Sequence, residues 1–358
     1  MRPVRLTDLT VLSVLLPTLT LTIIGTSVLE NGLEGRPSGP LDQCLTPLIL
    51  DGHTHMGFAS AASGEVVVES LDYISERGYH AVGFGMPVDR SESTDLPARL
   101  AGEISQLQAL SAELGTFTVT RGPEEIAQAC DEGKLAIVLT IEYFDGVFGN
   151  DPERVDRYHE MGILSITLVN NEHDRLLDRH ERTADVTLLG LEIISRMNQR
   201  GVLVDITHLW PQEMLAVVAA SNQPVIASHS NPQGAGAPNS ALFDVVVQAV
   251  AAKGGLIMLS FNANDLFRDG EDQVGAIDRL LNQMDHIRTL VGIDHVGIGT
   301  DLQAFGQYVP EELGQPAAIS DLRAVMAARG YSQSDIQKVL AGNFLRLLGE
   351  VTKLLQDR

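Results

Sequence analysis

Residues 48–56 read LILDGHTHM, and the fold can be worked out from the pattern that begins there. The stretch starts as an apolar run, which is typical of a strand buried on both faces of a sheet, and it ends in Asp51, His53 and His55. Seven more apolar runs of similar length follow along the chain. The eight predicted strands span residues 48–56, 80–86, 135–142, 163–169, 202–207, 224–228, 256–261 and 295–300.

The stretches between these runs have helical spacing. Residues 244–252 and 276–291 are two of them. After the fourth run, apolar residues recur at every third position and predict one buried helix face, made of Leu188, Leu191, Ile194 and Met197. Strands that alternate with helices indicate a parallel sheet, and eight such units predict a closed (β/α)8 barrel of the TIM type. No Gly-x-Gly-x-x-Gly follows the first strand, which weakens the alternative of a dinucleotide-binding fold.

Composition excludes several classes of protein. The chain has 358 residues, of which 44% are hydrophobic and 20% charged, so a large buried core is expected rather than a disordered chain. It carries 25 Lys and Arg against 47 Asp and Glu, a net charge of -22. This excess argues against nucleic acid as a partner, and against charge-driven binding to an anionic membrane surface, because both need clustered cations.

The amino-terminal segment allows two interpretations. Arg2 and Arg5 precede an uncharged run over residues 11–29, and small residues near its end resemble a cleavage site. Residues 1–29 are therefore interpreted as a signal peptide or membrane anchor, which would make the protein exported or anchored. The alternative is a short strand, because Pro17 and the alternation over residues 19–23 suit one. Residues 30–46 are rich in Gly and Pro and predict a linker, so the barrel domain is expected over residues 47–358.

Potential metal ligands and an acid–base group end five of the eight predicted strands. In a barrel of this type the carboxyl ends of the strands meet at one rim, where the chemistry of such enzymes takes place. Each residue alone has a structural explanation, but their convergence on one rim indicates a metal site. Four other histidines begin strands or lie in helices and are interpreted as structural: His80, His159, His286 and His295. The candidate site residues are His53, His55, Glu142, His208, His229 and Asp301.

Spacing supports this interpretation at the first strand. Residues i and i+2 of a strand point to the same face, so His53 and His55 can bind one ion together. One carboxylate such as Glu142 can bridge two ions with its two oxygens. Imidazole and carboxylate ligands suit Zn²⁺ and related divalent ions, and two such ions can hold a hydroxide between them at neutral pH.

The order of these motifs resembles the renal or membrane dipeptidase family (peptidase family M19) of the amidohydrolase superfamily. The resemblance covers about residues 47–352. Its most specific pieces are Ser-His-Ser-Asn at residues 228–231 and Gly-Asn-Phe-Leu-Arg at residues 342–346. The other matching pieces are LDGH at residues 50–53, IE at 141–142, DITH at 205–208 and GIGTD at 297–301.

The resemblance implies a (β/α)8 barrel with a two-zinc site. His53 and His55 would hold the first ion and Glu142 would bridge, while His208 and His229 would hold the second. The resemblance further implies that Asp301 takes a proton from the bridging water and passes it to the leaving amine. The implied activity is hydrolysis of a peptide or related amide bond by the metal-bridging hydroxide.

Three departures from the family pattern concern the metal and substrate sites. Position 55 is His where the family has Asp, which removes one negative charge but keeps a zinc ligand. Asn170 stands where the family has a substrate-polarising His, and His173 could replace it if the loop bends inward. Residues 231–240 contain no Arg to grip a substrate carboxylate. Three arginines could supply one from other loops, or are solvated surface charges: Arg175, Arg179 and Arg268.

The sequence therefore predicts a dipeptidase-like hydrolase with a small-molecule substrate. We expect simple dipeptides with a free carboxylate to be poor substrates. An alternative is a divergent amidohydrolase that acts on a cyclic amide, lactone or ester. A third hypothesis is a non-catalytic metal-binding scaffold. The full set of five ligands and Asp301 argues against it, because a protein without catalysis has no physical need for them. Exposed helix faces could support a homodimer, although no pattern specifies one.

Overall fold

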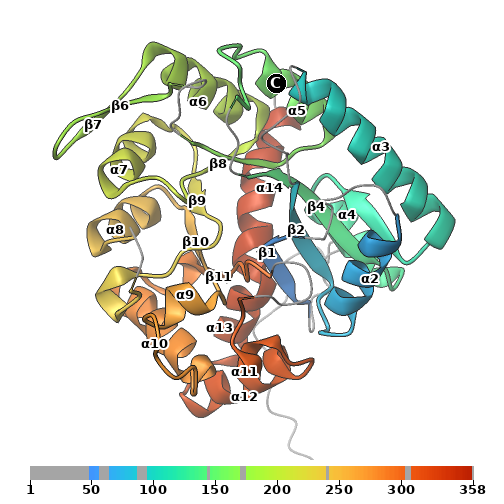
Figure 1. Ribbon diagram of the computed structural model, residues 1–358, viewed down its shortest axis with the longest axis vertical. Helices are drawn as coiled ribbons and strands as arrows, with labels where there is room; N and C mark the ends of the chain where they lie inside the picture. The colour runs from blue at the N-terminus through green and yellow to red at the C-terminus, as the bar shows by residue number, and fades with distance from the viewer. Residues whose placement is uncertain are drawn as a thin grey trace, which may run out of the picture. The chain divides into compact units, whose positions relative to one another are not determined.

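Eight parallel strands pair in chain order around a barrel (Figure 1). The structure, a computed structural model, describes residues 48–55, 64–86, 95–142, 146–169, 175–238, 242–302 and 308–356. Each barrel strand lies inside one of the eight predicted runs, so the predicted strand set is confirmed. The barrel strands are β1 (Leu50–Thr54), β2 (Ala81–Met86), β4 (Leu135–Ile141), β5 (Ser165–Thr167), β8 (Leu203–Asp205), β9 (Val225–Ala227), β10 (Leu256–Leu259) and β11 (Val296–Ile298).

The barrel closes where β1 meets the segment after β11. Thr54 forms a parallel bridge with Leu302, whose carbonyl accepts the His55 amide hydrogen at 2.9 Å. One step earlier, the Asp301 amide donates to the His53 carbonyl at 3.0 Å. The first and last strands are therefore joined by main-chain hydrogen bonds, and the predicted (β/α)8 barrel is confirmed.

Helices follow the strands and cover the outside of the barrel (Figure 1). The predicted helices over residues 244–252 and 276–291 match α8 and α10. The helices are α2 (Gly64–Ser75), α3 (Leu96–Leu114), α4 (Pro123–Asp131), α5 (Arg154–Met161), α6 (Leu188–Arg200), α7 (Pro211–Ala220), α8 (Asp244–Ala252), α9 (Ala263–Leu266), α10 (Ala276–Val291), α11 (Glu311–Gly314), α12 (Ala318–Ala328), α13 (Gln333–Gln337) and α14 (Asn343–Gln356).

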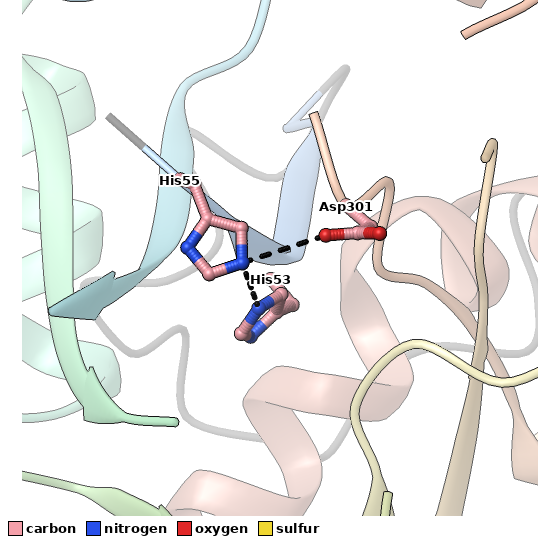
Figure 2. Close-up of side chains that lie close together, drawn as sticks. All are labelled: His53, His55 and Asp301. Atoms are coloured by element: carbon pink, nitrogen blue, oxygen red, sulfur yellow. Dashed lines mark hydrogen bonds and ion pairs between the residues drawn. The ribbon is translucent and has the colours of Figure 1, made fainter. Parts of the chain in front are cut away.

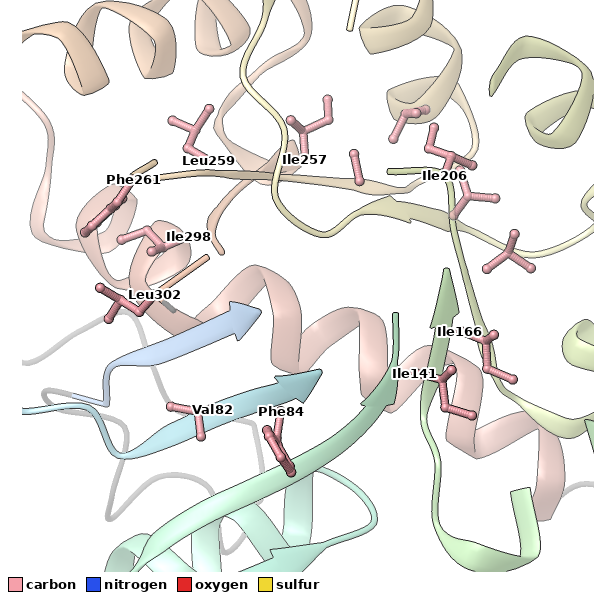
Figure 3. Packing of buried hydrophobic residues seen from close by; sticks show 14 of the residues in the cluster. Val82, Phe84, Ile141, Ile166, Ile206, Ile257, Leu259, Phe261, Ile298 and Leu302 are labelled. Carbon is pink, nitrogen blue, oxygen red and sulfur yellow. The ribbon is translucent and has the colours of Figure 1, made fainter. Parts of the chain in front are cut away.

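Alternate residues of each strand belong to two apolar layers. On β4, Ile137 and Leu139 belong to the cluster that packs between the sheet and the helices. Figure 3 shows other members of this cluster, such as Ile141 and Ile166. Ala136 and Val138 point inward, into a second cluster that also includes the apolar face of α14. Because the inner cluster gathers residues from the first halves of the strands, α14 covers the amino-terminal end of the barrel. The carboxyl-terminal end is left for the polar residues.

The sheet also contains strands that the apolar runs do not predict. Strand β3 (Phe117–Thr120) pairs with the first half of β4, along the edge whose second half pairs with β5. Strands β6 (Leu177–Arg179) and β7 (Ala184–Val186) form an antiparallel hairpin beside α7 (Figure 1). Both additions are short and contain polar residues as often as apolar ones, so the pattern of buried runs carries no signal for them.

The predicted buried face of α6 is wrong in its first half. Ile194 and Met197 are buried, but Leu188 is 86% exposed and Leu191 is 44% exposed. Each residue of a helix turns by about 100°, so positions three apart drift by about 60° and four of them reach opposite sides. The core face is formed instead by Gly190, Ile193, Ile194, Met197 and Asn198.

Residues 1–47 lie outside the described residues. The predicted signal peptide or anchor and the predicted linker are part of that segment, and both stay predictions. In the part of the chain that the structure describes, none of the helices has the length and apolar character needed to cross a membrane.

Candidate metal centre

Glu142 lies at the centre of four imidazole rings at the carboxyl-terminal end of the barrel. Its Oε2 atom is 3.2 Å from Nε2 of His53 and 2.8 Å from Nε2 of His55. Its Oε1 atom is 2.7 Å from Nε2 of His208 and 3.2 Å from Nε2 of His229. Each carboxylate oxygen therefore faces a different pair of histidines, which is the arrangement that a carboxylate shared by two ions requires.

The imidazole nitrogens converge within each pair. The Nε2 atoms of His53 and His55 are 3.4 Å apart, and those of His208 and His229 are 3.1 Å apart. Together with Glu142, His53 and His229 form a buried group whose ligand atoms all lie within 4.8 Å of one another. Nitrogen and carboxylate donors packed this closely fit divalent zinc-like ions.

A bulge in β1 points its two histidines into the barrel mouth. Asp51 pairs with Val82 and Thr54 pairs with Phe84, so β1 uses one more residue than β2 over this interval. The extra residue changes which face the later side chains occupy. Gly85 on β2 leaves room for them, because a Cβ there would lie 2.9 Å from the His53 ring and 3.3 Å from the His55 ring.

Buried Asp51 ties β1 to the segment that carries Asp301. Its Oδ1 accepts the main-chain amides of His53 at 3.1 Å and Thr300 at 2.8 Å, and its Oδ2 accepts the Thr300 hydroxyl. Burial raises the pKa of Asp51 to about 7, against the opposing effect of these hydrogen bonds. Asp51 therefore sets the distance between His53 and Asp301 rather than facing the mouth itself.

A chain of hydrogen bonds orients His229. Ser228 donates at 2.6 Å to Oδ2 of Asp205, and its hydroxyl lies 2.9 Å from Nδ1 of His229. Asp205 also accepts from the hydroxyls of Thr167 and Thr207, both at 2.7 Å. A partner at Nδ1 fixes the ring so that Nε2 points at Glu142, which is how histidines that bind metal are usually held.

Asp301 lies beside His55 at the edge of the cluster, as Figure 2 shows. Its Oδ1 is 3.5 Å from Nε2 of His55, and its Oδ2 accepts the side-chain amide of Asn262 at 3.0 Å. The main chain of Asp301 has φ 53°, and His208 has φ 69°. Both non-glycine residues occupy the strained left-handed region, which is commonest at functional sites.

Charges in the cluster balance one another. Burial raises the pKa of Glu142, but the surrounding histidines outweigh it and hold that pKa well below its usual range. Burial lowers the pKa of His229, but Glu142 outweighs it and raises that pKa to about 9. Glu142 raises the pKa of His55 in the same way, whereas burial lowers the pKa of His53. Protons on these histidines thus offset the negative charge of Glu142, and metal ions bound at the site would displace them.

A cavity of about 720 Å³ opens beside the cluster. His208, His229 and Asp301 line one part of it. The rest of the lining comes from Thr207, residues 209–212, Met214, residues 230–231, residues 242–243, Asn262, Asn264 and Asp265. The cavity is large enough for a small molecule and brings that molecule to the histidines and to Asp301.

Comparison with protein families identifies the chain. The family model described as membrane dipeptidase, peptidase family M19, matches residues 89–357. The chain belongs to the membrane dipeptidase family. The match begins after β1, so His53 and His55 lie before it and are placed by the structure alone.

Two fungal dipeptidases resemble the chain over part of its length. Dipeptidase aclJ of Aspergillus oryzae is 26% identical over 223 residues, which is 61% of this chain and 52% of that protein. Dipeptidase tcpJ of Claviceps purpurea is 24% identical over 232 residues, or 64% of this chain and 54% of that protein. The matched region thus spans about half the length of these relatives.

Solved structures share the fold of this membrane dipeptidase family member. An amidohydrolase from Pseudomonas aeruginosa has a TM-score of 0.72 and 19% identity, with 88% of this chain and 99% of that chain covered. A metallo peptidase from Rhodobacter sphaeroides, liganded with a phosphinate mimic of the dipeptide L-Ala-D-Ala, has a TM-score of 0.67 and 20% identity, with 85% and 99% covered. At this level of identity the likeness shows the barrel fold.

The predicted substrate residues Asn170 and His173 lie outside the described residues and stay predictions. The three arginines considered for the substrate carboxylate are described. Arg175 pairs with Asp178, and the side chain of Arg175 is 75% exposed. Arg179 donates to the fully buried Glu213 at 2.8 and 2.9 Å and lies over the Trp210 ring. Arg268 is also exposed, so none of the three arginines lines the cavity.

Two cavity residues, Asn262 and Asp265, do not belong to any of the ligand motifs predicted from the sequence. Asn262 and Asp265 follow β10, whose predicted run ends without a His or a carboxylate. Burial raises the pKa of Asp265, which hydrogen-bonds Ser260. The polar residues at positions 260, 262, 264 and 265, directly after an apolar strand, were the available signal.

Proposed function

We propose that this member of the membrane dipeptidase family is a metal-dependent hydrolase that cleaves a peptide or related amide bond. The observation that carries the proposal is the two-sided contact of Glu142 with two pairs of histidines. The dipeptidase names of the fungal relatives and the dipeptide mimic in the Rhodobacter structure support the substrate class.

The chain would hold two divalent ions. His53 and His55 would ligate the first, His208 and His229 the second, and Glu142 both. When bound, such ions supply a Lewis acid and a water molecule of lowered pKa, and the imidazole and carboxylate donors favour zinc. His55 gives the site one negative charge fewer than a carboxylate at that position would.

Asp301 is the group placed to move the proton. Its Oδ1 lies 3.5 Å from Nε2 of His55, and the cavity reaches its side chain. Asp301 would accept the proton of the attacking water and deliver it to the leaving nitrogen. Because Asn262 donates to Oδ2, the other oxygen, Oδ1, remains directed at His55.

The lining of the cavity favours substrates without a free carboxylate as a second candidate class. Among the described residues, no Lys or Arg lines the cavity, so a carboxylate would lack a guanidinium partner there. Cyclic amides, lactones and esters lack that group. The active enzyme could therefore act on them or on amidated dipeptides.

The test is metal analysis together with a substrate panel. The full-length chain is stripped with a chelator, reloaded with Zn²⁺, and assayed on dipeptides, their carboxyl-terminal amides and lactones. We expect close to two ions per chain, loss of hydrolysis on stripping and recovery on reloading. Hydrolysis that persists without metal, or no hydrolysis of any member of the panel, would refute the proposal.

The panel also decides between the two substrate classes. We expect amides or lactones to be cleaved at least as well as free dipeptides. A strong preference for the free carboxylate that Arg179→Ala abolishes would instead assign the carboxylate contact to Arg179. Arg175→Ala is the matched control, since Arg175 is more exposed and pairs with the nearby Asp178.

A further inference from the structure

The cavity beside the cluster combines an apolar surface with a carboxylate that the proposed reaction does not use. The apolar surface comes from Leu209, Trp210, Pro211, Met214, Leu242 and Phe243. The carboxylate is Asp265 on the short helix α9, in the same lining. A ligand that fits both needs an apolar portion and a group that pairs with a carboxylate.

Asp265 has a hydroxyl partner but, among the described residues, no lysine or arginine paired with it. It hydrogen-bonds Ser260 and shares the cavity lining with Asp301, His229 and His208. Among the described residues, no Lys or Arg forms an ion pair with Asp265. The segments between residues 48 and 356 that the structure leaves undescribed contain one arginine, Arg90, and no lysine.

A carboxylate in a partly buried wall is stabilised when a cation reaches it, because burial removes part of its hydration. Asp301, the other carboxylate of the cavity, is already held by Asn262 and faces His55. Asp265 is therefore the acid left for the ligand. The net charge of -22 acts in the same direction at long range, since it attracts cations and repels anions.

We infer that Asp265 selects a substrate with a cationic side chain on an apolar stem, of the lysine or arginine type. The methylene groups would pack on the apolar wall, and the ammonium or guanidinium group would pair with the Asp265 carboxylate. The inference rests on the proposed function for the identity of the site, but it concerns recognition and not the chemical step.

The test compares lysine with norleucine, which has nearly the same stem without the ammonium group. Four substrates place lysine or norleucine on either side of the scissile bond, each as the carboxyl-terminal amide. With the full-length, zinc-loaded chain we expect kcat/KM for one lysine substrate to exceed that of its norleucine partner by about 10- to 100-fold, the range for a hydrogen bond to a charged group. Asp265→Asn should bring this ratio close to one.

Controls separate local recognition from net charge. Asp269→Asn removes the same charge from an exposed position outside the cavity lining and should leave the lysine preference intact. Asp265→Glu keeps the charge and should retain part of the preference. Equal rates for lysine and norleucine in the unmodified chain would overturn the inference, as would a preference that survives Asp265→Asn.

Binding distinguishes failure of the inference from failure of the proposed function. Calorimetric titration of the zinc-loaded chain with lysinamide and norleucinamide needs no turnover. Tighter binding of lysinamide that Asp265→Asn abolishes, with no hydrolysis of any substrate, would uphold the recognition role and refute the hydrolase. Hydrolysis without discrimination in either measurement would do the reverse.

Discussion

The side-chain amide of Asn262 donates a hydrogen bond of 3.0 Å to Oδ2 of Asp301. The contact leaves Oδ1 directed at His55, 3.5 Å from its Nε2. Asn262 therefore orients the Asp301 carboxylate, so that Oδ1 is the oxygen placed to accept a proton. The first two predictions concern this pair.

We expect Asp301→Asn to retain the metal ions and lose turnover. The amide cannot accept the proton, and loss of a general base costs about 10²-fold or more in rate. The measurement is kcat together with the metal content of the purified variant. A near-normal rate would mean that another residue moves the proton, and Asp269→Asn controls for the change in net charge.

For Asn262→Ala we expect a smaller loss of kcat than for Asp301→Asn. Without the donor at Oδ2, the Asp301 carboxylate is no longer held with Oδ1 toward His55. Adding Asn262→Ala to Asp301→Asn should then cost no further rate, because the two residues act as one unit. A further loss in the double variant would show that Asn262 acts on the fold of the loop and not on Asp301.

Glu142→Gln should abolish or greatly weaken the binding of both ions. An amide keeps the shape of the side chain but has one oxygen and no charge, so it cannot serve two ions. Metal titration of the stripped variant measures the effect, with Glu132→Gln at an exposed position as the control. Two ions bound tightly in the variant would contradict the bridging role.

Ser228→Ala tests the chain of hydrogen bonds behind His229. Without the hydroxyl between Asp205 and Nδ1 of His229, the ring loses its fixed orientation, and we expect metal affinity to fall about 10- to 100-fold. The affinity is read from competition with a chelator. Ser195→Ala on the exposed side of α6 should change nothing, and an unchanged affinity in Ser228→Ala would remove Asp205 and Ser228 from the site.

The metal-free protein should lose stability as the pH rises from about 6.5 to about 9. Glu142 raises the pKa of His229 from 6.5 to about 9 in the folded state. The stabilisation from this proton is therefore fully present below pH 6.5 and is lost as the pH passes about 9. Its size is on the order of 3 kcal/mol.

Denaturant unfolding of the chelated chain at several pH values in this range measures the effect. Glu142→Gln should flatten the dependence, because the raised pKa comes from that carboxylate. Stability that rises with pH in the unmodified, metal-free chain would contradict the prediction.

Much of the site could be predicted from the sequence because a parallel barrel converts order along the chain into position in space. Strands buried on both faces read as apolar runs, and their carboxyl ends must meet at one rim. Polar residues at those ends, from His53 to Asp301, therefore had to lie near one another. The close contacts between Glu142 and four histidines follow from that topology.

Other features depended on contacts that leave no trace in a local pattern. The bulge in β1 turns His53 and His55 into the mouth, and it is visible only in the register against β2. Leu188 and Leu191 look like core residues, but the direction of α6 against the sheet leaves both exposed.

The amino-acid sequence by itself determined the eight strands, the barrel and the identity of the residues at its rim. Only the tertiary structure decided which oxygen of Glu142 faces which pair of histidines, and that Asn262 and Asp265 belong to the cavity. The physical reason is that burial and strand periodicity act between near neighbours in the chain, whereas the orientation of a side chain at the rim is set by hydrogen bonds from distant segments. Asp51 with Thr300, and Asn262 with Asp301, are two such pairs.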